Sequence, residues 1–531
     1  MSASREKKIR QELAAQGVPD IKEIRAAEER KQQRRSNILY GCIAGAFVLV
    51  AAALLVWNSN IIQRSSTAIS VDGVKYSTAE VDYYYNSAYN NLASGEYASY
   101  LSLNTSSPLS QQVMNDMDLM FTGAVLPEGK EEMTWHEYLV ENTKQQLIAQ
   151  TNLLKAADAE GFTFTDEMQA EIDNTMKDIA TYAKTSGVST GAYLKTMFGA
   201  SMTEKTFTKL LKDTVLVSHF QQSHWDALTY TDADLTAYYE KNPNQFDEAN
   251  YEYVYFRGTA PSTTDADGKT VAATDEENAA AKAKAEAAAN DVFKRFQAGE
   301  DLEKLAEEYK DIASYFHQES ASYSGGAVQD WVFDASRKAG DAELVNSGSA
   351  YYVVLYHSRA RSEYHPVNVR HILCKIDDSK LNSEDAGYAD ARQALIDMAK
   401  VEAEGLLSTF KAGEATPEAF ADLASKNSDD SGSVGNGGLY TNVAKGSMVE
   451  PFDQWIYDES RKAGDTGLVF VDQPGYYTGY HVMYFEGVAD APYWMLQAES
   501  AARTADFNEW LASIDEGLTA EEHSGMKYVG A

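Results

Sequence analysis

The chain has 531 residues, of which 44% are hydrophobic and 24% charged, so it has the composition of a globular protein and enough length for several buried cores. Its formal net charge of −34 argues against nucleic acid as a partner, because binding phosphate requires clustered Lys and Arg. It has two cysteines, and we expect no disulfide between them because Cys42 lies in an apolar segment far from Cys374.

The N-terminal part of the chain has the pattern of a membrane anchor. Residues 1–35 hold ten Lys/Arg against six Asp/Glu, a charge of +4, and residues 38–57 are twenty consecutive uncharged residues. Such a run is long enough to cross a bilayer as a helix, and the basic side is expected to stay in the cytoplasm. We therefore predict a cytoplasmic basic segment (1–36), a transmembrane anchor (37–57) and an extracytoplasmic remainder. A cleaved signal peptide, with "SSTA" as its cleavage site, is the alternative.

The pattern from 58 to 246 is mostly helical. A short hairpin is expected around Asp72-Gly73, and Ser77 with Glu80 forms a capping box for the helix that follows. Later helices are marked by a stop at Gly161 and by an N-cap at Thr165. We interpret this region as one helical lobe.

Downstream, the chain repeats one order of elements. A β-rich strand, an acidic loop, a long helix, Gly-rich turns and closing strands occur twice, and ten residues are identical between 331–345 and 455–469. The repeat predicts two β-α-β domains, 247–362 and 366–488. The tail, 489–531, is helical again, with Phe507, Trp510 and Leu511 on one face, and is expected to pack on the N-terminal lobe. The predicted fold class is α+β.

The second repeat carries a set of residues with a specific order and spacing. His371 follows a strand start, "SDDSG" supplies Asp430, "GGLY" supplies Leu439, and "GSMVEPF" supplies Met448 and Phe452. Thr478 and His481 lie in the closing strand "YYTGYHVMYF". In this order the stretch 366–487 resembles the parvulin family of peptidyl-prolyl isomerases.

The resemblance implies a role for each of these residues. His371 and His481 would lie on adjacent central strands in one hydrogen-bonded network, joined by Thr478, and Asp430 would face the peptide bond that is rotated. Leu439, Met448 and Phe452 would enclose the proline ring. Rotation about X–Pro is opposed by a barrier of about 20 kcal/mol from amide resonance, and lowering it requires no metal and no cofactor.

Each residue also has a purely structural interpretation. The three apolar residues are consistent with ordinary core positions, and Asp430 with a loop cap. The two histidines are consistent with a buried pair that stabilises the sheet. The family usually has Asp and Gly beside the leucine, where this chain has Gly438 and Tyr440, and a small residue in place of Trp455.

The first repeat lacks these features. Aligning the strands places Tyr253 at the position of His371 and Tyr352 at that of His481, and the stretch "KGSMVEPF" has no counterpart. We expect the first domain to be inactive.

The overall plan resembles membrane-tethered foldases of the bacterial envelope, and "ISVDGVKYSTAEV" is similar to the start of their chaperone regions. The resemblance implies a peptidyl-prolyl isomerase and chaperone whose partners are unfolded or newly exported polypeptides with X–Pro bonds. A holdase that uses parvulin folds as a scaffold is the main alternative, and an envelope scaffold with specific partners is a third. The oligomeric state stays open.

Overall fold

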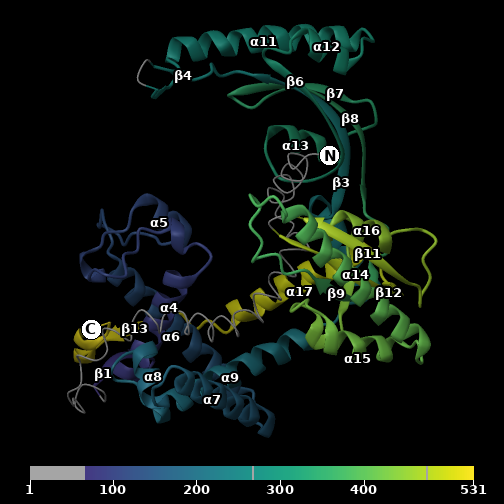
Figure 1. The fold of residues 1–531 in the computed structure, drawn as a ribbon. Helices are drawn as coiled ribbons and strands as arrows, with labels where there is room; N and C mark the ends of the chain where they lie inside the picture. Colours follow the sequence, from purple (N-terminus) through teal and green to yellow (C-terminus); the bar gives the residue numbers. More distant parts are fainter. Residues whose placement is uncertain (1–65, 266–267, 474–475, 531) are drawn as a thin grey trace. The chain divides into compact units, whose positions relative to one another are not determined.

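The computed structural model describes residues 66–265, 268–473 and 476–530 (Figure 1). The predicted basic segment and anchor, 1–57, lie outside these ranges. Among the residues that are described, none of the helices has the length and apolar character needed to cross a membrane. The described residues form two compact units, one made of 230–502 and the other of 66–229 together with 503–530.

The unit 230–502 contains two modules with the same sheet topology. The first module is an antiparallel sheet in the order β6-β3-β8-β7, and the second is an antiparallel sheet in the order β10-β9-β12-β11. The strands of the first are β3 (Asp247–Arg257), β6 (Ala313–Ser322), β7 (Ala342–Asn346) and β8 (Ala350–Arg361). The strands of the second are β9 (Val367–Lys375), β10 (Leu439–Val443), β11 (Thr466–Gln473) and β12 (Tyr477–Val488).

Helices cover both faces of each sheet. In the first module α11 (Asp275–Gln297) and α12 (Leu302–Glu308) pack on one face, and α13 (Ala327–Val332) packs on the other (Figure 1). In the second, α14 (Tyr388–Ala412) and α15 (Pro417–Asn427) form one layer, and α16 (Glu450–Ile456) covers the opposite face. Because successive side chains of a strand point to opposite faces of the sheet, each module has two separate hydrophobic cores, one on each face.

The repeated "SRKAGD" block forms the same turn in both modules. In the first copy, the backbone N–H and hydroxyl of Ser336 donate to Oδ1 of Asp334, at 2.8 and 2.5 Å. In the second, Ser460 donates to Asp458 in the same way, at 2.9 and 2.6 Å. The aspartate side chain thus closes each turn through an Asx-type contact.

The glycine of each block fastens the turn to the last strand of its sheet. Gly340 N–H donates to the carbonyl of Tyr356 at 2.8 Å, and Gly464 N–H donates to that of Phe485 at 2.9 Å. Both glycines have a positive φ, +90° and +92°, a conformation that glycine adopts without a Cβ penalty. The repeated sequence is therefore a structural element that joins α13 or α16 to the sheet.

The other unit is a helical lobe with a small sheet. Strands β1 (Thr67–Val71) and β2 (Val74–Ser77) form the expected hairpin, with Asp72 at a φ of 47°. The Glu80 carboxylate accepts from Ser77 N–H at 2.8 Å, which confirms the predicted capping box. The helices are α4 (Thr78–Ser94), α5 (Asp116–Thr122), α6 (Trp135–Ala159), α7 (Asp166–Thr185), α8 (Thr190–Phe198) and α9 (Glu204–Ala227).

The C-terminal residues complete this lobe. From Arg503 onward, α17 (Tyr493–Ser513) packs Trp510 and Leu511 on α6 and α9, as expected from the sequence. Strand β13 (Ala520–Glu522) then pairs with β1, and Val529 enters the main core of the lobe.

The unit boundaries differ from the predicted 246 and 489. Helix α10 (Asp232–Lys241) belongs with the two modules, because Leu235 packs in one cluster with Trp494 and Ala498 of the first part of α17. Helix α17 therefore contributes its first part to one unit and its second part to the other.

Candidate active site

The two histidines of the second module lie on one face of its sheet. Strands β9 and β12 are adjacent, and their register pairs His371 with Met483 and His481 with Leu373. Both side chains are therefore on the face covered by α16, diagonally across the strand pair. Their Nδ1 atoms are 2.8 Å apart, and each residue is only 4% exposed.

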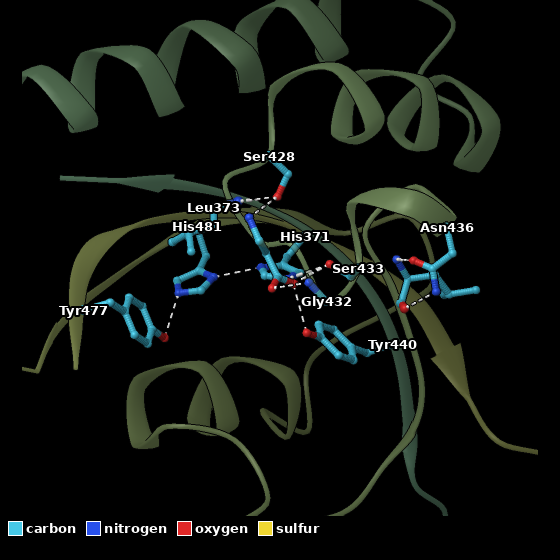
Figure 2. Close-up of polar contacts among 11 residues, drawn as sticks. His371, Leu373, Ser428, Gly432, Ser433, Asn436, Tyr440, Tyr477 and His481 are labelled. Atoms are coloured by element: carbon cyan, nitrogen blue, oxygen red, sulfur yellow. Dashed lines mark hydrogen bonds and ion pairs between the residues drawn. The ribbon is translucent and has the colours of Figure 1, made fainter. Parts of the chain in front are cut away.

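A carboxylate and three hydroxyls extend this pair into a network (Figure 2). Asp430 Oδ2 is 2.9 Å from Nε2 of His371 and also accepts from the hydroxyls of Ser433 and Tyr440. At the other end, the hydroxyl of Tyr477 is 3.1 Å from Nε2 of His481.

The proton positions follow from the charge on Asp430. Burial alone would raise the pKa of Asp430, but the hydrogen bonds from His371 and Ser433 outweigh it and hold the pKa far below its usual range. Because the carboxylate accepts, Nε2 of His371 carries a proton, and the Nδ1 atoms of His371 and His481 share one hydrogen bond. Nε2 of His481 shares the next hydrogen bond with the Tyr477 hydroxyl.

Burial keeps the far end of the network uncharged. Loss of solvation, and next the neighbouring His371, lower the pKa of His481 to about 3. Burial, together with the charge of Asp430, raises the pKa of Tyr477 to about 12. Between pH 5 and 8 the far end of the network, His481 and Tyr477, therefore carries no charge.

A two-glycine turn holds this network against the sheet. Gly437 and Gly438 have φ of +71° and +75°, and His371 N–H donates to the carbonyl of Gly438 at 2.9 Å. A Cβ on Gly438 would lie 2.2 Å from the carbonyl oxygen of His371. Only glycine permits this approach, which brings the segment carrying Asp430 next to the histidine.

An apolar wall adjoins the histidines. The ring of Phe452, on α16, meets both imidazoles edge-on, with centroids 5.5 Å from His371 and 5.3 Å from His481. Met448 packs in the same cluster and is partly buried. Of the three residues predicted to enclose a proline ring, these two lie on the face of the histidines.

The register corrects the prediction for Leu439. Leu439 pairs with Arg370 and Tyr440 pairs with Val369, so Tyr440 is the residue on the face of His371 and Phe452. Leu439 is on the opposite face. A shift of one residue in a strand exchanges the two faces, and the Gly437-Gly438 turn sets that shift here.

The prediction that Thr478 joins the histidine network is also wrong. Thr478 and Val482 lie on the same face of β12, and Val482 packs against α14. Its hydroxyl donates to Asp472 at 2.7 Å and accepts from Arg392 of α14 at 2.7 Å. The neighbouring Tyr477 takes the place in the network that the sequence assigned to Thr478.

Three members of the network were missed in the sequence, namely Ser433, Tyr440 and Tyr477. Ser433 is 1% exposed, although it lies in a segment of polar and glycine residues that is typical of a solvated loop. The alternation of β12 was a usable signal for Tyr477, because it lies four residues before His481.

Trp455, on α16, packs over the edge strand β11. Its indole covers Gly467 of β11, where a Cβ would be 2.5 Å from Nε1, and the guanidinium of Arg461 stacks 4.4 Å from the ring. Arg337 stacks on Trp331 in the first module in the same way, at 4.7 Å. The tryptophan therefore has a scaffold role that the two modules share.

The first module has an aromatic cluster where the second has its polar network. The register of β3 and β8 pairs Tyr253 with Val354, which matches the pairing of His371 with Met483, and so supports the alignment of the two modules. Tyr253 stacks on Phe316 at 5.0 Å and lies 5.9 Å from the ring of Tyr352.

The sheet order, the buried histidine pair, the carboxylate and the apolar wall together define a rotamase domain of the parvulin type. A family model described as the PPIC-type PPIASE domain matches residues 351–483, which include His371, Asp430 and His481. The chain therefore carries a parvulin-type peptidyl-prolyl isomerase domain. A comparison with proteins of curated function finds no significant match.

Solved structures of foldases are among those with local similarity. The peptidylprolyl isomerase PrsA from Bacillus anthracis is 22% identical over 29% of this chain and 59% of its own, with a TM-score of 0.17. The foldase PrsA from Streptococcus pneumoniae is 14% identical over 74% and 90%, with a TM-score of 0.22. A SurA-like chaperone from Campylobacter jejuni is 14% identical over 77% and 94%, with a TM-score of 0.17. Scores this low say nothing about the activity of the present chain.

Proposed function

We propose that the second module catalyses cis–trans isomerisation of X–Pro bonds in polypeptides and that the first module does not. The observation that carries the proposal is the Asp430–His371–His481 network beside Phe452 and Met448. A proline ring against the apolar wall would place its amide near the hydroxyls and the carboxylate. Such a preorganised polar side favours the twisted amide over the planar one.

The test is isomerisation of a short X–Pro peptide by the purified chain. Changing His371→Tyr and His481→Tyr together reproduces the residues of the first module and should lower the rate on the order of 100-fold. The matched control is Tyr253→Phe with Tyr352→Phe in the first module, which should leave the rate unchanged. If the wild-type chain is inactive, the holdase becomes the better explanation.

A chaperone role is favoured by a second observation in the lobe. Around α5, the exposed apolar side chains include Met120 at 70% and Val125 at 83%, and Phe121 stacks on Tyr97 and Tyr100. Flexible methionines beside aromatic rings suit varied apolar segments of unfolded chains. Suppression of client aggregation by the purified chain tests this role.

For the location, we propose that residues 37–57 anchor the chain in the cell membrane with the bulk outside the cytoplasm. The support is the uncharged run after a basic segment. In fractionated cells the chain should pellet with membranes and be digested by protease added outside. Deleting 37–57 should abolish the membrane association. Newly exported polypeptides would then be the partners.

A further inference from the structure

A cluster of three metal-ligating side chains lies in the first module, away from the aromatic cluster. Glu252 on β3, His317 on β6 and His357 on β8 each offer one ligand atom, and these atoms all lie within 4.8 Å of one another. The three residues come from three adjacent strands. Within the described part of the chain, this is the one such group.

The strand register brings the three side chains to one face. Glu252 and His317 are direct cross-strand partners, and they share the face of Val254, Tyr315 and other residues that pack under α11 and α12. The side chain of His357 is 34% exposed and that of Glu252 is 20% exposed. The cluster is therefore fixed by the sheet yet open to an ion from solvent.

The present contacts orient these donors. Nε2 of His357 is 2.8 Å from Oε1 of Glu252, and Nε2 of His317 is 3.0 Å from Oδ1 of Asn250. The hydroxyl of Tyr315 also bonds to the Glu252 carboxylate. Amide and hydroxyl groups that hold the ligands of a metal in this way set the ring tautomer and the carboxylate orientation.

The second module has other residue types at the same positions. Its residues at the positions of Glu252 and His357 are Arg370 and Glu486, which form an ion pair, and the cross-strand position of His317 is Leu439. Where the second module has a cation, an anion and an apolar residue, the first module has two imidazoles and a carboxylate. An ion pair alone would not require the second imidazole.

We propose that Glu252, His317 and His357 form a binding site for a divalent transition-metal ion of the zinc class. Two imidazoles and one carboxylate are a common zinc ligand set, with water in the fourth position. Ligand atoms at about 2.1 Å from a tetrahedral ion are about 3.4 Å apart, so atoms that already lie within 4.8 Å of one another need only a small approach. The ion would join three adjacent strands of the first module.

The test is calorimetric titration of the metal-free full chain with Zn²⁺. One tight site per chain is expected, and Mg²⁺, which prefers oxygen ligands, should not compete for it. His317→Ala and His357→Ala should each weaken the site by more than the roughly 10–100-fold that loss of an outer partner costs. Co²⁺ bound to the wild-type chain should show a visible spectrum that both variants lack.

Two further variants control for folding and for other sites. Glu252→Arg with His357→Glu installs the ion pair of the second module, so it should keep the circular dichroism of the wild type and lose the site. His219→Ala changes a histidine that also contacts a carboxylate, with its Nε2 3.0 Å from Glu171. Among the described residues, His219 belongs to no group of three metal-ligating side chains, so this variant should leave binding unchanged. Absence of a stoichiometric site in the wild-type chain, or an unchanged site in both histidine-to-alanine variants, overturns the proposal.

Discussion

Asp430 is the residue on which the polar side of the candidate active site converges. Its Oδ2 accepts from a histidine, a serine and a tyrosine, and the side chain is still 20% exposed. An ionised group that is held by three donors and reaches solvent keeps its position when substrate arrives. The carboxylate thus offers a fixed charge beside the apolar wall.

Tyr440 should matter more for turnover than Leu439. Tyr440→Phe removes one donor to an ionised carboxylate, and such hydrogen bonds contribute about 1.5–3 kcal/mol, so we expect kcat/KM to fall about tenfold or more. Leu439→Ala changes a side chain on the opposite face and should alter kcat/KM by less than about twofold. Peptide isomerisation rates measure both. A larger loss in Leu439→Ala than in Tyr440→Phe would show that Leu439 helps to enclose the proline ring, as the sequence predicted.

His481 should stay neutral well below pH 6. Its pKa of about 3 in the folded chain lies below the usual value of about 6.5, so the unfolded chain takes up the proton first as pH falls. The stability contributed by the neutral ring is complete above about pH 6.5 and is lost as pH falls toward 3. In ¹⁵N spectra of the histidine-labelled chain, assigned with His481→Gln, the His481 signals should remain those of a neutral ring at pH 5. A titration midpoint above pH 5 contradicts the network.

The sequence predicted the histidines, Asp430, Met448 and Phe452 in one place but exchanged two neighbours. Leu439 for Tyr440 and Thr478 for Tyr477 are both errors of one residue. The residue types do not show which member of each pair faces the histidines. In both pairs, either residue could lie on either face of the sheet. For Leu439 and Tyr440, the face is decided by the turn before β10, which has two positive φ angles. The spacing of residues in the sequence does not reveal this geometry.

Among the elements, the Gly437-Gly438 turn connects the site to the sheet. It packs against α15 and the backbone of β9, so the loop that carries Asp430 and Ser433 has little freedom to move. Helices were predicted well from their caps, because a capping box is a local signal. The turn depends on a tertiary contact, which the sequence shows only as a pair of glycines.

Gly438→Ala should unfold or displace this loop. The added Cβ would be 2.2 Å from the carbonyl oxygen of His371, in addition to the cost of about 1–2 kcal/mol for alanine at a positive φ. Gly446→Ala is the matched control, since Gly446 has a φ of +73° and nothing within 4 Å of a Cβ. Activity should be lost in the first variant and nearly retained in the second. Equal losses in thermal unfolding midpoint would show that backbone strain alone explains both.

At the scale of the whole molecule, isomerisation and client binding are assigned to different units. The exposed apolar side chains near α5 belong to the lobe, and the histidine network belongs to the second module. The two activities should therefore be separable by substitution.

Met120→Ser with Val125→Ser should weaken suppression of client aggregation and leave peptide isomerisation unchanged. Both side chains are exposed, so their loss removes apolar contact area without opening a core. Met398→Ser with Val401→Ser is the matched control, because these residues of α14 are each 69% exposed. Light scattering of an unfolded client measures the effect. If the two double variants behave alike, the surface near α5 has no special part in client binding.

Strand β13 pairs with β1, although residues 230–502 separate the two halves of the lobe. A chain that is synthesised from its N-terminus presents β1 first and the strand that completes its sheet last. Each module draws its core from elements close in sequence, so it can fold while the lobe still waits for its final segment. A chain interrupted before residue 520 would therefore hold a finished isomerase module beside a lobe that lacks one strand.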